Sequence, residues 1–230
     1  MKSSKGKERI AVIGLGYVGL PLMSELSKKF YTIGFDISES RVNSLKQGYD
    51  VTGELNKSKL RRLSSDLTCK TEDIADCNVY IVSVPTPITK NKLPDLLPIS
   101  QACKLVGKVL ARGDLVIFES TVYPGLTEEH CVPLLEKASK LEYLADFSVG
   151  YSPERINPGD KIHTLTSIVK IVSGSDKKAL SRVNNIYSKI IKAGTYQAPS
   201  IKVAEAAKVI ENTQRDINIA LINELSQIFN

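Results

Sequence analysis

The glycine spacing near the start of this chain constrains its fold more than any other feature. Gly14, Gly16 and Gly19 follow the apolar run Arg9 to Ile13 and precede an amphipathic stretch to Lys29. That order predicts a strand, a tight turn and a helix. The first glycine allows the turn, the second lets backbone amides approach a pyrophosphate, and the third lets helix and strand pack closely. The phosphates then lie at the positive N-terminus of the helix, so the motif predicts a dinucleotide site.

An acidic residue after the second apolar run supports this prediction. Asp36 follows Tyr31 to Phe35, where a carboxylate can accept hydrogen bonds from both hydroxyls of an adenosine ribose. The same carboxylate repels a 2′-phosphate, which favours NAD over NADP. Arg41 leaves part of this choice open, because a guanidinium can bind a phosphate or stack on the adenine. The alternative is that the glycines only form a turn and Asp36 caps a helix; we predict NAD binding.

Apolar runs alternate with amphipathic stretches along most of the remaining chain. Predicted strands cover residues 67–70, 79–84, 115–118, 147–151 and 168–172, and predicted helices cover 38–48, 71–75, about 98–111, a stretch after Pro124, and 176–191. Continuous apolar strands between amphipathic helices are typical of a parallel sheet covered on both faces. The fold class is therefore predicted as α/β, with a Rossmann-like doubly wound parallel sheet.

A long helical pattern follows Pro199 and runs from residue 201 to about 229. At 1.5 Å per residue it is roughly 43 Å long, more than a helix covering a sheet needs. We therefore predict an NAD-binding domain at 1–198 and the start of a central helical, dimerising domain at 199–230. The expected homodimer forms through the 201–229 helix. Its apolar stripe consists of Val203, Ala207, Ile210, Ile217, Leu221, Leu225 and Ile228.

The charge balance favours small anionic ligands over nucleic acid. The formal net charge is +6, but Lys and Arg are spread along the chain. The densest group, Lys57, Lys59, Arg61 and Arg62, is typical of a solvated helix face. Attraction to a dinucleotide or a nucleoside diphosphate sugar accounts for a mild basic excess equally well. We expect no nucleic-acid partner.

The cysteines and the hydropathy indicate an ordinary cytoplasmic setting. Four cysteines lie far apart without a C-x-x-C pair and accompany only two histidines, a pattern that favours neither a zinc site nor a disulfide framework. No secretory segment and no apolar run of about 20 residues is present. The expectation is a cytoplasmic protein without a metal and without a membrane partner.

Five motifs in a fixed order extend the argument from cofactor to family. Together they resemble the UDP-glucose/GDP-mannose dehydrogenase family over the whole length of the chain. The motifs are Gly14 to Pro21 (GLGYVGLP), Val84 to Pro87 (VPTP), Glu119 to Pro124 (ESTVYP), Ser152 to Asp160 (SPERINPGD), and Lys208 to Glu224 (KVIENTQRDINIALINE).

The last two motifs resemble the branch of that family that oxidises UDP-N-acetylhexosamines. The UDP-glucose branch has a second glutamate four residues after the first, whereas Pro158 stands four residues after Glu154 here. This resemblance implies NAD-dependent oxidation of the sugar C6 alcohol to a uronic acid, for precursors of capsule, Vi antigen or O antigen. It leaves the sugar epimer open.

Lys208 and Asn212 are the predicted centre of the alcohol oxidation. Residues four apart on one helix project from the same face, so the two side chains can converge on one oxygen. An ammonium and an amide donor there stabilise the alkoxide that forms as the C6 hydroxyl loses its proton. The alternative is a polar pair on a solvated helix face.

The resemblance assigns roles to loop residues after the predicted strands. It implies that Glu154 is a general acid or base or orients water, and that Thr121 orders water or substrate beside Glu154 and contacts the cofactor. It also implies cofactor contacts for Thr86 and, through their backbones, for Tyr17 and Val18. For both threonines, capping of a strand end is a comparable explanation of the same residue.

Three further residues are expected to contact the substrate. Arg155 and Ile156 follow Glu154 directly, and Arg215 lies on the same helix as Lys208. The resemblance implies that these residues bind the nucleotide sugar, and an arginine suits its diphosphate.

Members of the family continue into a region with a catalytic cysteine in a Gly-x-Cys-x-x-x-Asp-Pro setting, which captures the aldehyde for the second oxidation. Nothing in this chain matches that motif. We therefore expect the chain to be the NAD-binding portion of such an enzyme. Two alternatives stay open: a two-electron 3-hydroxyacid dehydrogenase, which uses a similar lysine and asparagine pair, and a non-catalytic NAD-binding module that dimerises.

Overall fold

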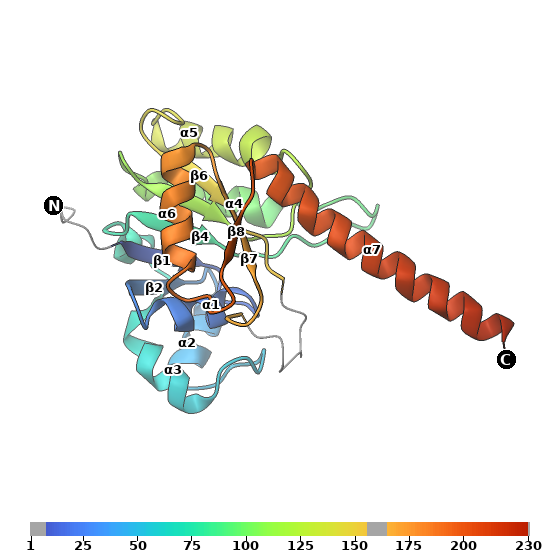
Figure 1. The fold of residues 1–230 in the computed structure, drawn as a ribbon. Helices are drawn as coiled ribbons and strands as arrows, with labels where there is room; N and C mark the ends of the chain where they lie inside the picture. Colours follow the sequence, from blue (N-terminus) through green and yellow to red (C-terminus); the bar gives the residue numbers. More distant parts are fainter. Residues whose placement is uncertain (1–7, 156–164, 230) are drawn as a thin grey trace.

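Eight strands of the described residues form one sheet (Figure 1). The computed structural model describes residues 8–155 and 165–229. The strands are β1 (Arg9–Ile13), β2 (Tyr31–Phe35), β3 (Leu67–Thr68), β4 (Val79–Val82), β5 (Leu115–Phe118), β6 (Ser148–Tyr151), β7 (Lys170–Gly174) and β8 (Thr195–Gln197). Their spatial order is β3-β2-β1-β4-β5-β6-β7-β8. The first six strands thus have the 3-2-1-4-5-6 order of a Rossmann fold, which confirms the predicted doubly wound sheet.

One pair of strands departs from the prediction of a parallel sheet. β7 runs antiparallel to β6, with Gly150 opposite Gly174 and Tyr151 opposite Ser173, whereas the other six pairs among the described strands are parallel. An antiparallel neighbour needs no crossover helix, and the described residues between β6 and β7 hold none. The edge strand β8 was missed because it is short and two of its three residues are exposed, so no apolar run marks it.

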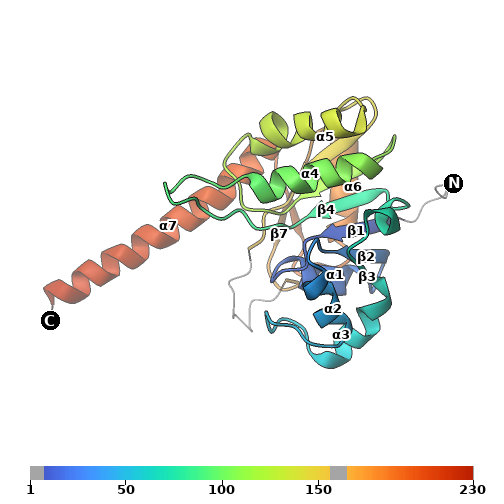
Figure 2. The ribbon, with the colours of Figure 1, turned by 180° about the vertical axis from the view of Figure 1, so that it is seen from behind.

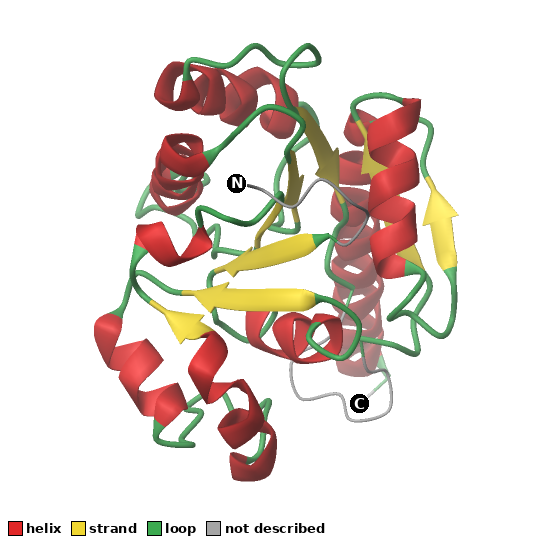
Figure 3. Ribbon diagram, turned by 90° about the vertical axis from the view of Figure 1, so that its left-hand side faces the viewer, coloured by secondary structure: helices red, strands yellow, loops and turns green. Residues whose placement is uncertain are grey.

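Helices cover both faces of this sheet (Figures 2 and 3). The α-helices are α1 (Gly19–Leu26), α2 (Glu39–Lys46), α3 (Lys57–Leu63), α4 (Leu97–Val109), α5 (Val132–Ser139), α6 (Lys177–Tyr187) and α7 (Ile201–Ile228), and 3-10 turns lie at η1 (Ser64–Asp66) and η2 (Thr71–Ile74). The predicted helix after Pro124 begins as a π turn, η3 (Thr127–Cys131), which continues into α5.

Two apolar cores form where these helices meet the sheet. Alternate residues of β1 point to opposite faces: Ile10 and Val12 join one core, and Ala11 and Ile13 join the other. The first core includes α1, α2, α3 and α6, and the second includes α4, α5 and the first turn of α7. Burial on both faces explains why these strands are continuous apolar runs.

Helix α7 leaves the body of the molecule along most of its length (Figure 1). Ile201, Ala204, Glu205 and Lys208 are buried, while every described residue from 212 onward is exposed. The outer part of the predicted apolar stripe therefore faces outward. Among the described residues, no helix has both the length and the apolar character of a membrane span.

Candidate functional site

A cavity of about 520 Å³ follows the carboxyl edge of the sheet, from the end of β2 to the loop after β6. Ligands of open α/β sheets bind at this edge, near the strand where the winding reverses. Lys208 of α7 also lines the cavity. The cavity brings together the following predicted site residues: Gly14, Gly16, Tyr17, Val18, Asp36, Thr86, Thr121, Glu154 and Lys208.

Each glycine of the first loop has a different environment. Gly14 has a φ of +95°, the left-handed region that favours glycine, and its N–H donates to the carbonyl of Phe35. A Cβ on Gly19 would lie 1.9 Å from the carbonyl oxygen of Gly14. A Cβ on Gly16 would meet nothing within 4 Å, and Gly16 lines the cavity. The loop is therefore tightly packed against other backbone at Gly19 and open to the cavity at Gly16.

The N-terminus of α1 is suited to an anion. No side chain of the described residues caps this helix, and its first turn contains no acidic residue. The positive end of the helix dipole favours a phosphate group there. The loop and helix together fit the pyrophosphate of a dinucleotide.

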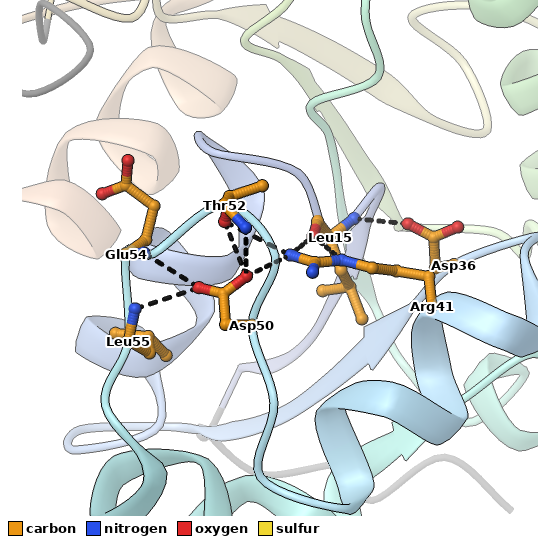
Figure 4. Close-up of polar contacts among 7 residues, drawn as sticks. All are labelled: Leu15, Asp36, Arg41, Asp50, Thr52, Glu54 and Leu55. Carbon is orange, nitrogen blue, oxygen red and sulfur yellow. Dashed lines mark hydrogen bonds and ion pairs between the residues drawn. The ribbon is translucent and has the colours of Figure 1, made fainter.

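Asp36, which follows β2, contacts the glycine loop at Leu15 (Figure 4). Its Oδ2 accepts a 2.9 Å hydrogen bond from the N–H of Leu15, and its Oδ1 accepts one of 2.9 Å from the N–H of Ser38. Ser38, and not Asp36, caps α2, because its hydroxyl accepts from the N–H of Arg41. Asp36 is half-buried and lines the cavity, so its carboxylate is oriented by backbone and remains accessible to a ligand.

Arg41 stabilises the glycine loop through the backbone of Leu15 (Figure 4). Its Nε and Nη2 donate to the carbonyl oxygen of Leu15 at 3.0 and 2.8 Å, and Nη2 also pairs with Asp50 at 2.8 Å. Arg41 does not line the cavity. Asp50 further accepts from the backbone of Thr52 and Leu55. Burial would raise the pKa of Asp50, but these hydrogen bonds outweigh it and hold that pKa below its ordinary value.

At the far end of the cavity, hydrogen bonds tie two loops together. The hydroxyl of Thr86 donates to the carbonyl oxygen of Thr121 at 2.6 Å, and that of Ser120 donates to the carbonyl of Val84 at 2.6 Å. The hydroxyl of Tyr151 reaches the carbonyl of Ser120. These contacts join the loop after β4 to the loop after β5 across the cavity.

Glu154 belongs to a buried cluster of ionisable side chains. The ammonium of Lys170 lies 3.0 Å from Oε2 of Glu119 and 3.3 Å from Oε2 of Glu154. Tyr187 donates its hydroxyl to Oε1 of Glu119. The side chains of Lys170, Glu119 and Glu154 are exposed by only 3, 0 and 9 per cent, and both carboxylates line the cavity.

The charges in this cluster perturb one another. Burial raises the pKa of Glu119, although Lys170 opposes the shift. Burial alone would lower the pKa of Lys170, but the attraction of Glu119 and Glu154 outweighs it and raises that pKa, so the ammonium stays protonated. Burial also raises the pKa of Tyr187 well above its usual value, which keeps the phenol a donor.

Lys208 reaches the cavity from α7, whereas Asn212 lies one turn further out. Lys208 is buried, and this burial lowers its pKa. Asn212 is exposed and does not line the cavity. The base of the helix is fixed by Glu205, whose carboxylate accepts from the N–H groups of Gly125 at 2.5 Å and Thr127 at 3.0 Å.

The two arginines with expected substrate roles share one acidic partner. Arg155 binds Glu211 through Nε at 3.3 Å and Nη2 at 3.1 Å, and Arg215 approaches the same carboxylate at 3.4 Å. Neither arginine lines the cavity. Ile156 lies outside the described residues.

Sequence reasoning missed Glu119, Lys170 and Tyr187. A signal existed for Lys170, because a lysine within the apolar run from 168 to 172 is rarely buried without a charged partner. Glu119 also directly follows a buried strand. Nothing in the sequence around Tyr187 distinguishes it from an ordinary core residue of an amphipathic helix.

The strand order, the glycine loop against an uncapped helix, and the cavity along the carboxyl edge define a Rossmann dinucleotide-binding domain. Comparison with known sequences narrows this class. The chain belongs to the UDP-glucose/GDP-mannose dehydrogenase family, and residues 8–191 match the NAD binding domain of that family.

Individual relatives agree with this assignment. The chain is 57% identical over 223 residues to UDP-N-acetyl-D-glucosamine 6-dehydrogenase of Pseudomonas aeruginosa, covering 96% of this chain and 53% of that protein. It is 56% identical to Protein CapL of Staphylococcus aureus, covering 96% and 52%. The structure of UDP-D-ManNAc dehydrogenase from Pyrococcus horikoshii superposes with a TM-score of 0.86 at 35% identity, covering 94% and 52%. The chain thus spans about half the length of the curated relatives that it matches.

Proposed function

We propose that this chain carries the NAD site and the first-oxidation residues of a UDP-N-acetylhexosamine 6-dehydrogenase that supplies uronic acids for cell-surface polysaccharide. One observation carries the proposal: a single cavity joins the glycine loop to Lys208, so that a dinucleotide bound at the loop extends toward an ammonium. The name of the Pseudomonas aeruginosa relative at 57% identity supports the substrate class.

The cofactor occupies the first part of the cavity in this proposal. Gly16, Tyr17 and Val18 hold the pyrophosphate through the backbone, and Asp36 binds the adenosine ribose. Thr86 and Thr121 contact the cofactor further along, where their loops meet. Arg41 contributes by fixing the carbonyl of Leu15 and thus the shape of the glycine loop. Bound NAD supplies the hydride acceptor.

The alcohol is activated at the other end of the cavity. Lys208 donates a hydrogen bond to the C6 oxygen and stabilises negative charge on it as the proton leaves. Burial lowers the pKa of Lys208, which eases proton transfer at that atom. Glu154 is the general acid or base, Thr121 orders the reacting group, and Asn212 adds a second donor when substrate lies along α7.

The substrate diphosphate is assigned to Arg155 and Arg215, with Ile156 beside them. Both guanidinium groups contact the carboxylate of Glu211. A diphosphate offers more acceptor oxygens than one carboxylate and can draw both arginines onto itself.

Self-association through α7 completes the proposal. We divide the chain into an NAD-binding domain at 1–198 and the beginning of a second domain at 199–230. The outer part of α7 exposes a row of apolar residues that a second copy can cover. They include Ile210, Ile217, Leu221 and Ile228, each more than half exposed. The four free cysteines suit a reducing, cytoplasmic setting.

The decisive experiment measures NADH formation and cofactor binding by the same chain. Stopped-flow absorbance follows the reaction with NAD and UDP-N-acetylglucosamine, UDP-N-acetylgalactosamine or UDP-glucose, while calorimetry compares NAD with NADP. We expect NAD to bind more tightly than NADP, and NADH to form from the N-acetyl sugars but not in Lys208→Ala.

Other outcomes identify the alternatives. Oxidation of 3-hydroxyisobutyrate or 6-phosphogluconate, with no response to UDP sugars, contradicts the proposal and favours a two-electron hydroxyacid dehydrogenase. Tight NADH binding by a dimer without any turnover favours a non-catalytic module.

A further inference from the structure

The buried cluster of Glu119, Glu154, Lys170 and Tyr187 contains three groups to which the proposed function gives no role. Moving an ion out of water is costly, and well-packed apolar side chains often replace a buried ion pair without loss of stability. Lys170 and Glu119 are exposed by at most 3 per cent. Stability alone is therefore a weak explanation for charges at these two positions.

The reversed strand β7 brings Lys170 to the carboxyl edge of the sheet. Lys170 is the first residue of β7. In a parallel strand it would lie at the amino edge, remote from the cavity. The antiparallel register pairs Gly150 with Gly174 and Tyr151 with Ser173, and beyond these pairs the ammonium of Lys170 contacts the carboxylate of Glu154. The antiparallel direction of β7 thus places the ammonium of Lys170 next to Glu154.

A chain of contacts leads from the core to the carboxylate of Glu154. Tyr187 on α6 holds one oxygen of Glu119, and the other oxygen of Glu119 holds the Lys170 ammonium at 3.0 Å. Lys170 then donates to Oε2 of Glu154 at 3.3 Å. Oε1 of Glu154 accepts from the N–H of Arg155 at 2.6 Å. Both oxygens of Glu154 are thereby held, one by backbone and one by the buried ammonium.

We propose that Lys170 and Glu119 are positioning residues that fix the orientation of the Glu154 carboxylate at the wall of the cavity. Lys170 supplies the contact, and Glu119 keeps the ammonium of Lys170 in place. The inference rests on the proposed function only for the proton-transfer role of Glu154; the contacts themselves do not depend on which substrate is oxidised.

The test combines a spectroscopic and a kinetic measurement on four variants. Lys170→Met removes the ammonium and keeps the length of the side chain, Lys170→Arg retains the charge, and Glu119→Gln retains an acceptor for Tyr187. Lys178→Met, on the exposed start of α6, is the matched control. Amide NMR spectra check that each variant is folded.

The first readout is the carboxyl ¹³C signal of Glu154, assigned by its loss in Glu154→Gln. We expect this signal to move in Lys170→Met and Glu119→Gln, to return toward the parent position in Lys170→Arg, and to stay unchanged in Lys178→Met. An unchanged signal in a folded Lys170→Met variant overturns the proposal. If Lys170→Met does not fold, the same criterion applies to Glu119→Gln.

The second readout is the rate of NADH formation with UDP-N-acetylglucosamine. A misplacement of about 1 Å can cost about 100-fold in rate, so we expect a loss of that order in Lys170→Met, with NAD affinity unchanged and with partial recovery in Lys170→Arg. A moved ¹³C signal in a chain that oxidises no UDP sugar supports the positioning role and contradicts the proposed function. An unmoved ¹³C signal in a chain that oxidises UDP sugars supports the proposed function and contradicts the positioning role.

Discussion

Gly16 and Gly19 lie three residues apart in one loop and face opposite surroundings. A methyl group on Gly19 collides with the backbone of Gly14, whereas one on Gly16 enters open space at the cavity. The first glycine of this pair is thus available to a ligand, and the second is required by the fold.

The variants Gly16→Ala and Gly19→Ala should therefore separate binding from stability. We expect Gly19→Ala to lower the free energy of unfolding by about 1–3 kcal/mol, because backbone must move to admit the methyl group. We expect Gly16→Ala to unfold like the parent but to bind NAD at least about tenfold more weakly, equivalent to about 1.4 kcal/mol. Urea unfolding and calorimetry measure the two effects. Equal affinity for NAD in Gly16→Ala and the parent would argue against a pyrophosphate at this loop.

Lys208 should make the free energy of unfolding depend on pH in the alkaline range. Burial lowers its pKa below the ordinary 10.5, so between the folded-state pKa and 10.5 the unfolded chain binds more protons and stability rises with pH. Lys208→Met removes the buried charge. We expect this variant to be more stable than the parent near neutral pH, with a difference that shrinks as the pH approaches 10.5. Urea unfolding across this pH range measures the effect. If the difference in free energy of unfolding between Lys208→Met and the parent grows with pH, the predicted direction is wrong.

At the scale of elements, a buried carboxylate of α7 contacts the segment from Gly125 to Thr127, where η3 begins. Glu205 is fully buried and accepts from the N–H groups of Gly125 and Thr127. Gly125 has a φ of +98°, so this turn depends on glycine as well. The contact places the base of α7 beside the Thr121 loop and so helps to position Lys208.

Removal of this carboxylate should loosen the whole junction. Glu205→Ala leaves two buried N–H groups without their acceptor, at a cost of about 1–3 kcal/mol each. We expect a corresponding fall in the free energy of unfolding, measured with urea. Glu224→Ala, on the exposed part of the same helix, is the control and should change little. Similar stability of the two variants would show that Glu205 does not hold the junction.

The sequence predicted elements well where a single physical signal dominates. β1, β2 and β5 have the predicted bounds because each is a continuous apolar run, and Pro199 and Ser200 mark the start of α7. β8 and the direction of β7 were missed, because an exposed edge strand has no apolar pattern and strand direction depends on the whole chain path. The bounds of shorter elements shifted by a few residues: β3 ends at Thr68 and not at Lys70.

The candidate site followed the same rule. The spacing of the glycines from Gly14 to Gly19 determines the backbone geometry of the loop, so the loop and the helix after it were predictable from the sequence. Glu119 and Lys170 meet only after β5 and β7 enter the sheet, at positions 51 residues apart. No local pattern reports such a pair. Arg41 has a structural contact that local spacing does not predict, because its guanidinium donates to the carbonyl of Leu15 in the glycine loop; its contact with a ligand stays a prediction.

At the scale of the whole molecule, the exposed apolar side of α7 should drive self-association. We expect the parent chain to form a concentration-dependent dimer in sedimentation experiments. Ile217→Asp places an unpaired charge in the interface and should weaken the dimer at least about tenfold, because burying such a charge is costly. Asn223→Asp adds the same charge on the opposite side of the helix and should leave the dimer intact. Equal weakening by both variants would place the interface elsewhere.

The geometry of α7 also ties together two properties that are usually measured separately. Lys208 lies near the point where the helix leaves the sheet, between the anchored residues around Glu205 and the exposed outer turns. At about 1.5 Å per residue, the helix continues for roughly 30 Å beyond Lys208 to Ile228. In the proposed function, the surface that pairs two copies and the ammonium that binds the C6 oxygen therefore lie on one continuous helix.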